Sequence, residues 1–429
     1  MTTSSVHAPR VTVARRIAGS VLTIAIATAG AAQADVVAEF NAVAARTATP
    51  PAGATYPAVT PEERRTLSFV DLATVHLAMY DAVVAIEGGF EPYAIVPQSP
   101  AAGASSSAAA GAAACAVLHG LFPNRSPQYQ ADCAPYQAGS GADAATARGI
   151  TLGIEVGQKM LAERADDGRD GVPDYVPGGG VGDFVPAAPG NPIWHFAPHM
   201  RAFTLGSPAQ FRADGPPALT SASYAAAFDE VKQLGRTGGA ALSLEQQETA
   251  RFHTENPNLF WPRASRAFMN QSSLLANARL AAMLQVSIGD AILGCFDSKY
   301  FFDAWRPRTA IPAAATDGNP ATIADAGWTP FAASPNHPEY PSGHSCIAGA
   351  VGEVVKSHYR TPQVPFTWTS TVTGTARSYD SVYEMIREIK AARVHGGMHF
   401  RFANDDGATL GRRTAQWVLR NYLRPIGAR

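Results

Sequence analysis

Residues 337–345 read HPEYPSGHS, where a proline-rich segment gives way to a helical pattern. At this point Ser342 brings a hydroxyl, Gly343 opens the helix with its free backbone N–H groups, and His344 brings an imidazole. Free N–H groups at a helix start bind anions, and an imidazole beside them can give or take a proton. The stretch therefore predicts an anion site with an acid/base group. Taken alone, it also fits a capped helix with an incidental histidine.

Two cations precede this stretch in residues 299–307, which read KYFFDAWRP. Lys299 and Arg306 are seven residues apart, which is two helical turns, so both are predicted to project from one helix face. Like charges on one face repel each other, and this favours an anion shared between them. The alternative is that the two cations are unrelated and lay their apolar stems along the surface.

A third cluster follows in residues 392–400, which read ARVHGGMHF. Arg393 adds a third cation and His399 a second imidazole. His395 and His399 are four residues apart, a spacing that could hold a metal on one helix face. Two glycines between them argue against a regular helix, and no glutamate follows His395 as a zinc-protease motif requires.

Outward from these clusters, most of the chain has apolar residues at helical spacing. The expected helices cover residues 62–86, 108–121, 142–164, 221–234, 272–297 and much of 343–429, and another begins at a Ser243–Gln246 capping box. Two Pro-rich connections, 172–218 and 311–341, interrupt them, and aromatic residues in the first predict an ordered loop. Residues 366–372 are the one tempting strand. The predicted class is all-α with long ordered loops rich in proline and glycine.

Composition and net charge indicate the class of protein and of binding partner. The chain has 429 residues, of which 46% are hydrophobic and 16% charged, so a large buried core is expected. The formal net charge of -1 gives no sequence-wide attraction to nucleic acid or to an acidic membrane surface. We therefore expect small-molecule partners rather than nucleic acid or a membrane. A homodimer is an open alternative to a monomer.

The N-terminus has the pattern of an export signal. Arg10, Arg15 and Arg16 precede an apolar stretch, residues 17–31, and the small-x-small sequence of residues 32–34 follows it. We expect residues 1–34 to be a signal peptide and the mature protein to be secreted or periplasmic. The alternative is an uncleaved N-terminal anchor.

An oxidising compartment would allow the four cysteines to pair. Cys115 and Cys133 are the simplest pair, because they close a short loop. Cys295 and Cys346 both lie near the clusters above, where a second disulfide and two free buried thiols are equally good interpretations.

Together, the three clusters resemble the vanadium-dependent haloperoxidases and their relatives, the type 2 phosphatidic acid phosphatases. The family pattern is Lys-x6-Arg-Pro, then Pro-Ser-Gly-His, then Ser-Arg-x5-His-x3-Asp. Here it runs from Lys299 to Pro307, from Pro341 to His344 and from Arg393 to His399, across intervals of 33 and 48 residues. The WRP and HPEYPSGHS versions look more like secreted bacterial haloperoxidases than like the lipid phosphatases.

The resemblance implies a fold of two four-helix bundles and vanadate as the cofactor. In such a site Lys299, Arg306, Ser342, Gly343 and Arg393 bind the vanadate oxygens, and His399 binds vanadium. His344, opposite, is the acid/base, and Lys299 polarises the bound peroxide. Hydrogen peroxide then oxidises a halide, to hypohalous acid or for halogenation of a small organic acceptor, and phosphate competes with vanadate.

For the halide there are two further candidate residues, of which the first, His337, is implied by family likeness. His337 stands where bromide-oxidising members often carry histidine, which favours bromide or iodide over chloride. Trp305 is a candidate wall of the halide pocket. Both also have structural readings, His337 as a loop residue and Trp305 as a core aromatic.

Two positions depart from the family pattern. Ala392 replaces the serine before Arg393, and Ala403 stands where an aspartate follows the ligand histidine. A ligand histidine needs a partner on its other ring nitrogen, and Asp405, Asp406 or a backbone carbonyl are the candidates here.

Two other functions use the same residues. In a secreted acid phosphatase of this superfamily the second histidine attacks phosphorus and the first protonates the leaving group. A non-catalytic periplasmic oxoanion-binding protein is the third reading. In domain terms we expect an N-terminal helical region, 35–220, and a C-terminal region, 221–429, that carries the site, packed as one unit.

Overall fold

The computed structural model describes residues 35–49, 65–139, 143–187, 190–271 and 273–427. The predicted signal peptide, residues 1–34, lies outside them. Residues 35–429 form one unit by their internal contacts. The predicted all-α class is confirmed, because helices dominate the described residues and the strands are short.

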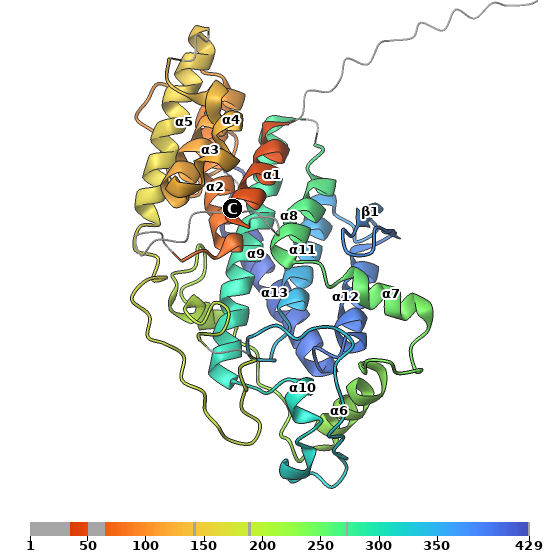
Figure 1. The fold of residues 1–429 in the computed structure, drawn as a ribbon. Helices are drawn as coiled ribbons and strands as arrows, with labels where there is room; N and C mark the ends of the chain where they lie inside the picture. The colour runs from red at the N-terminus through yellow and green to blue at the C-terminus, as the bar shows by residue number, and fades with distance from the viewer. Residues whose placement is uncertain (1–34, 50–64, 140–142, 188–189, 272, 428–429) are drawn as a thin grey trace, which may run out of the picture. The chain divides into compact units, whose positions relative to one another are not determined.

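One group of helices is built from the N-terminal part of this unit. It consists of α1 (Val36–Ala48), α2 (Ser68–Glu87), α3 (Ser106–Leu121) and α5 (Ala144–Glu163), which pack on one another (Figure 1). The alanines of α3 face the glycines of α5, and a Cβ on Gly153 would lie 2.2 Å from the carbonyl oxygen of Ala109. Small residues therefore let these two backbones approach closely.

A second group is built from the C-terminal part. It consists of α9 (Leu274–Phe302), α11 (Gly343–Tyr359), α12 (Val382–His395) and α13 (Arg401–Asn421). Helix α9 also packs against α2, so it joins the two groups. Its residues are almost all buried, which explains why its sequence is apolar on every side.

Shorter elements complete the unit. The helices are α4 (Gln130–Cys133), α6 (Ala222–Leu234), α7 (Leu244–Phe252), α8 (Pro257–Ser265) and α10 (Pro307–Ala310), with 3-10 turns at Pro123–Gln128, Ala134–Tyr136, Ala197–His199, Pro208–Phe211, Arg266–Phe268 and Ala314–Thr316. Strands β1 (Phe366–Thr369) and β2 (Ala376–Tyr379) form an antiparallel pair in which Phe366 faces Tyr379.

Most predicted elements are present with small changes at their ends. The capping box of Ser243 and Gln246 is confirmed at the start of α7. Helix α2 begins at Ser68, later than predicted, and α9 continues to Phe302, five residues beyond the predicted end. The prediction that Lys299 and Arg306 share a helix face is wrong, because α9 ends between them and Arg306 is the N-cap of α10.

The structure contains the predicted Cys115–Cys133 disulfide, and of the two interpretations of Cys295 and Cys346 it supports the free thiols. Cys115 and Cys133 form a disulfide that joins α3 to α4. Cys295 and Cys346 are free thiols, both buried in the core.

Within the part of the chain that the structure describes, two helices, α2 and α9, are long and apolar enough to cross a membrane. In α2, 89% of the apolar window is buried inside the protein, and in α9 100% is. Both therefore have the burial of core helices.

Candidate functional site

The ends of four helices and two loops place the predicted site residues together. Lys299 lies in the last turn of α9 and Arg306 at the start of α10, while Ser342 is the N-cap of α11. Arg393 lies in the last turn of α12, and His399 in the connection from α12 to α13. Residues that are a hundred positions apart in sequence therefore meet at one place.

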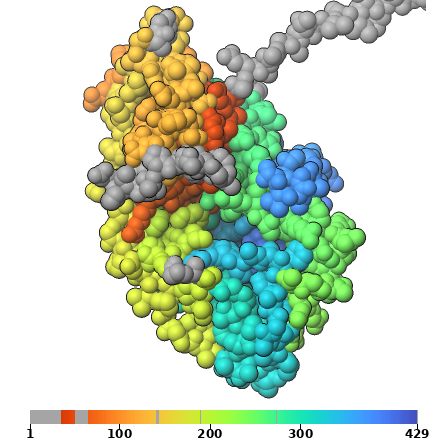
Figure 2. Space-filling view, viewed as in Figure 1, coloured from red at the N-terminus to blue at the C-terminus, as the bar shows by residue number. Residues whose placement is uncertain are grey.

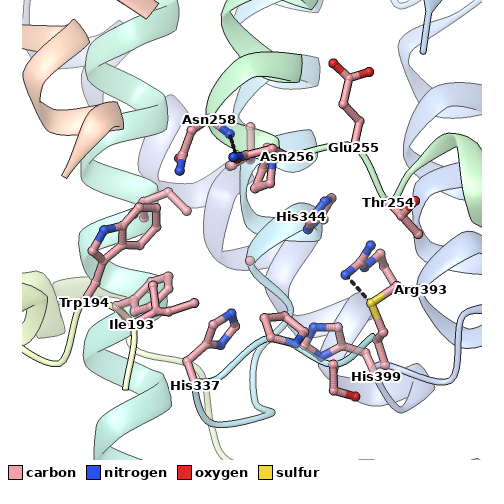
Figure 3. Close-up of a pocket in the computed structure, with 18 of the residues that line it drawn as sticks. Ile193, Trp194, Thr254, Glu255, Asn256, Asn258, His337, His344, Arg393 and His399 are labelled. Atoms are coloured by element: carbon pink, nitrogen blue, oxygen red, sulfur yellow. Dashed lines mark hydrogen bonds between the residues drawn. The ribbon is translucent and has the colours of Figure 1, made fainter. Parts of the chain in front are cut away.

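A cavity of about 430 Å³ opens at this place (Figure 3). Its polar side carries His337, Gly343, His344, Arg393 and His399. Thr254, Glu255, Asn256 and Asn258 line it as well, and its apolar lining comes from Phe69, Ile193, Trp194, Ile292, Phe296 and Ile347. The mixed lining suits a small polar group with apolar surface beside it.

Both Pro-rich connections supply walls of the cavity. Ile193 and Trp194 come from the first, and residues 333–337 from the second. The Ile193 N–H donates to the carbonyl of Asn336 at 2.8 Å, and Tyr300 donates to the carbonyl of Ile193 at 2.6 Å. The surface is hollowed between these two segments, coloured yellow-green and cyan in Figure 2. The prediction of an ordered first loop is thus confirmed over the part that the structure describes.

Lys299 and Arg306 are fully buried and hold the loop before Ser342. The Lys299 ammonium donates to the carbonyls of Pro338 and Glu339 at 2.9 and 3.0 Å. Arg306 donates to the carbonyl of His337 at 2.7 Å and from Nη2 to its Nδ1 at 2.9 Å. These acceptors are uncharged, so the two positive charges remain available to an anion.

Arg393 approaches the cavity from the other side. Its guanidinium donates to the carbonyl of His253 at 2.9 Å and to the Met398 sulfur, also at 2.9 Å. Its Nε is buried and has no partner in the described part of the chain. Nor, within those residues, does any ion pair join Lys299, Arg306 or Arg393 to a carboxylate.

Ser342 also has an unused donor. Although it is the N-cap of α11, its side chain makes no capping hydrogen bond, and its buried Oγ has no partner among the described residues. A Cβ on Gly343 would meet no atom within 4 Å, so space is open beside it. Buried donors without acceptors are costly unless a ligand accepts from them. The donor set fits an oxoanion such as vanadate or phosphate, which offers several acceptor oxygens.

Burial sets the charge states here. It lowers the pKa of Lys299 to about 8, and that of Arg306 and of Arg393 to about 9, so all three remain charged at neutral pH. Burial and the nearby cations also hold the pKa of His344 and of His399 well below the usual range. Both imidazoles are therefore neutral, the form that can bind a metal or accept a proton.

The partner of His399 is a residue that the sequence analysis missed. Nδ1 of His399 lies 3.0 Å from Oε1 of Glu339, which is fully buried. Burial raises the pKa of Glu339 to about 7, against the opposing effect of Lys299. The signal was present as an acidic residue inside the HPEYPSGHS stretch, but the spacing alone did not link it to His399.

The expected substitutes for the missing aspartate have other partners. Asp405 pairs with Lys390, and Asp406 accepts from the hydroxyl of Tyr340 at 2.7 Å. The expectation that one of them, or a backbone carbonyl, would be the partner of His399 is wrong, because Glu339 contacts its Nδ1 instead.

Two further candidates lie away from the cavity. Trp305 packs with Tyr224 and Phe400, and its indole N–H donates to the Tyr224 hydroxyl at 3.1 Å. The structure thus gives it the core role, and aromatic walls of the cavity come from Trp194 and Phe296. His395 ends α12, whereas His399 follows a turn, so the two do not share a helix face. Among the described residues no group of three or more His, Cys, Asp or Glu could hold a metal ion.

Sequence comparison agrees with the motifs. Residues 279–427 match the family described as the VCPO second helical-bundle domain. The vanadium chloroperoxidase of Curvularia inaequalis is 24% identical over 265 residues, which are 45% of this chain and 43% of that protein. The chain therefore spans less than half the length of this curated relative.

Solved structures share the fold over most of the chain. The first bacterial vanadium-dependent iodoperoxidase has a TM-score of 0.74 and 21% identity, covering 92% of this chain and 97% of its own. An apo-type bacterial vanadium-dependent chloroperoxidase has a TM-score of 0.67 and 16% identity, covering 86% and 96%. The predicted resemblance to the vanadium haloperoxidases is thus confirmed.

Proposed function

We propose that this protein, a relative of the vanadium haloperoxidases, is itself a vanadate-dependent haloperoxidase. The observation that carries the proposal is the set of three buried cations and the orphaned donors Ser342 Oγ and Arg393 Nε, together with the neutral imidazoles of His344 and His399. The family match over residues 279–427 supports the choice of vanadate over other oxoanions.

Each group then has a role set by its position. Ser342, Gly343 and Arg393 would hold the oxygens of vanadate, with the charges of Lys299 and Arg306 behind them, and His399 would be its nitrogen ligand. Bound vanadate would supply the chemistry by which hydrogen peroxide oxidises a halide. The buried cations stabilise negative charge there more strongly than they would in water.

His344 is placed to handle protons. It lies in the first turn of α11 and lines the cavity (Figure 3). Because its imidazole is neutral at rest, it can take a proton from hydrogen peroxide and later return one to the product. The apolar side chains of Trp194 and Phe296 line the same cavity.

The apolar part of the cavity lining also affects which halide is preferred. Larger halides are less strongly hydrated, so bringing iodide or bromide against apolar surface costs less than bringing chloride. His337 lines the same cavity, with its ring 5.1 Å from that of Phe296. With the iodoperoxidase among the proteins of similar fold, this favours iodide or bromide, with a small organic acceptor as the final target of halogenation.

We also infer that the protein acts outside the cytoplasm. The export pattern in residues 1–34 and the Cys115–Cys133 disulfide both fit an oxidising compartment. Mass spectrometry of the mature protein from the periplasm or the medium should show an N-terminus at Asp35. A mature protein that keeps residues 1–34 would contradict the inference.

The test of activity uses protein freed of phosphate and vanadate. Oxidation of iodide, bromide and chloride by hydrogen peroxide is followed while orthovanadate is added, and hydrolysis of a phosphate monoester is followed without it. We expect saturable, vanadate-dependent oxidation that phosphate suppresses, with chloride the poorest halide, and no activity in His344→Ala.

Two outcomes would contradict the proposal. Monoester hydrolysis that vanadate inhibits, without halide oxidation, would make the protein a phosphatase. Vanadate binding without turnover in either assay would leave an oxoanion-binding protein.

A further inference from the structure

We propose that Glu339 is the positioning residue of His399, a role for which the family pattern has an aspartate at the place of Ala403. The inference deepens the proposed function and rests on it, because it concerns how this chain holds its vanadate ligand. It also explains how the site is complete despite the departure at position 403.

The position of Glu339 is fixed through its backbone. Its N–H donates to the carbonyl of Ala304 at 2.9 Å, and its carbonyl accepts from the Lys299 ammonium at 3.0 Å. The side chain is fully buried. The backbone of Glu339 is thus held on both sides, which fixes the point from which its side chain extends.

The hydrogen bonds of the carboxyl determine the state of the imidazole. Oε1 accepts from the backbone N–H of Phe400 at 2.9 Å and lies 3.0 Å from Nδ1 of His399. An oxygen that already accepts from an amide acts as an acceptor for the histidine too, so Nδ1 carries the proton. In a neutral imidazole the lone pair is then on Nε2, which is the form a metal-binding histidine needs.

Other carboxylates near His399 are excluded by their contacts. Tyr340 holds the Asp406 carboxylate at 2.7 Å, and Asp405 pairs with Lys390 at the surface. Ala403 itself is buried against Tyr340 and Ala304, in the place where a longer side chain would have to fit. Glu339 reaches His399 from the loop that precedes Ser342.

This arrangement predicts that Glu339 affects the affinity for vanadate and the affinity for phosphate differently. Vanadate would use the His399 nitrogen as a ligand, whereas phosphate would use the cations and donors alone. Loss of the carboxyl from Glu339 should weaken the first and leave the second unchanged, because the cations and hydrogen-bond donors that hold phosphate stay in place. Damage to the pocket as a whole would weaken both.

The experiment measures the affinity of the full-length protein for orthovanadate and for inorganic phosphate by calorimetry, in wild type and in Glu339→Gln. We expect vanadate affinity to fall by about 10- to 100-fold, as is typical when a partner of a ligand histidine is lost, and phosphate affinity to stay within about threefold. Asp405→Asn is the matched control, a nearby carboxylate whose loss should change neither affinity.

The outcomes separate this inference from the proposed function. Suppose that the wild-type protein binds vanadate. If Glu339→Gln then loses affinity equally for the two anions, or for neither, the role of Glu339 alone is overturned. Wild-type protein that binds no vanadate would overturn the proposed function and this inference together. If Glu339→Gln does not fold, Glu339→Asp, which keeps the charge and shortens the reach, is measured in the same way with the same expectations.

Discussion

Ser342 and Ser345 stand three residues apart at the start of α11, and both are fully buried. The hydroxyl of Ser345 donates to the Asn404 side chain at 3.0 Å, whereas that of Ser342 has no partner in the described chain. A buried hydroxyl that is satisfied within the protein contributes to folding, and one that is not is available to a ligand. The two serines therefore separate stability from binding.

We predict that one alanine substitution lowers anion affinity and that the other lowers stability. Ser342→Ala should lower anion affinity by about 5- to 10-fold, because a hydrogen bond to a charged group is lost, with little change in stability. Ser345→Ala should lower the free energy of unfolding by about 1 kcal/mol and leave anion affinity unchanged. Phosphate calorimetry and urea unfolding of both variants check this, and a Ser342→Ala protein with full affinity would contradict it.

At the scale of elements, the contact of α3 with α5 depends on glycine. Gly149, Gly153 and Gly157 face α3, and a Cβ on any of them would lie between 2.2 and 2.7 Å from a heavy atom of that helix or its cap. These heavy atoms include backbone carbonyl oxygens, which cannot move without displacing the helix. This packing leaves no room for a methyl group.

Gly153→Ala is therefore expected to lower the free energy of unfolding by about 2 kcal/mol or more, despite the better helix propensity of alanine. Gln158→Ala, at an exposed position of the same helix, should change it by less than about 0.5 kcal/mol. Chemical unfolding of both variants is the measurement. Equal stability of the two would show that the helices are farther apart than described.

Helix α2 contains a fully buried histidine, His76, at its interface with α1. Nε2 accepts from the Asn41 side chain at 3.1 Å, and burial lowers the pKa of the imidazole to about 3. The unfolded chain binds a proton near pH 6.5, and the folded protein does so only near pH 3. Stability is therefore complete above pH 6.5 and is lost as the pH falls below it.

Between pH 7 and pH 5 this group alone should lower the free energy of unfolding by about 2 kcal/mol. His76→Gln should remove that part of the pH dependence, whereas His119→Gln, which replaces an exposed histidine, should keep it. Urea unfolding at the two pH values measures both. An unchanged pH dependence in His76→Gln would contradict the burial of His76.

For the whole molecule, the sequence predicts most of the fold, because local patterns carry it. The apolar spacing of α3, α5 and α9 and the Ser243 capping box are readable without tertiary information. The sequence does not show where α9 ends, because the residues between position 297 and Arg306 are still compatible with a helix. This is why Arg306 was expected on the wrong element.

The site could be predicted only where its residues belong to motifs. Lys299, Arg306, Ser342, His344, Arg393 and His399 were found by spacing, and the structure brings them together. The contact of Glu339 with His399 joins positions 60 residues apart, and the placing of Trp305 in the core depends on α6. Such long-range contacts have no local signature, so they had to come from the structure.

The most direct test of the account is a crystal structure of the protein soaked with orthovanadate in phosphate-free solution. We expect one vanadate in the cavity of Figure 3, with oxygens contacting Ser342 and Arg393 and with vanadium bound to Nε2 of His399. Nδ1 of the same ring should remain hydrogen-bonded to Glu339. An empty cavity, or vanadate bound without contact to His399, would contradict the central claim.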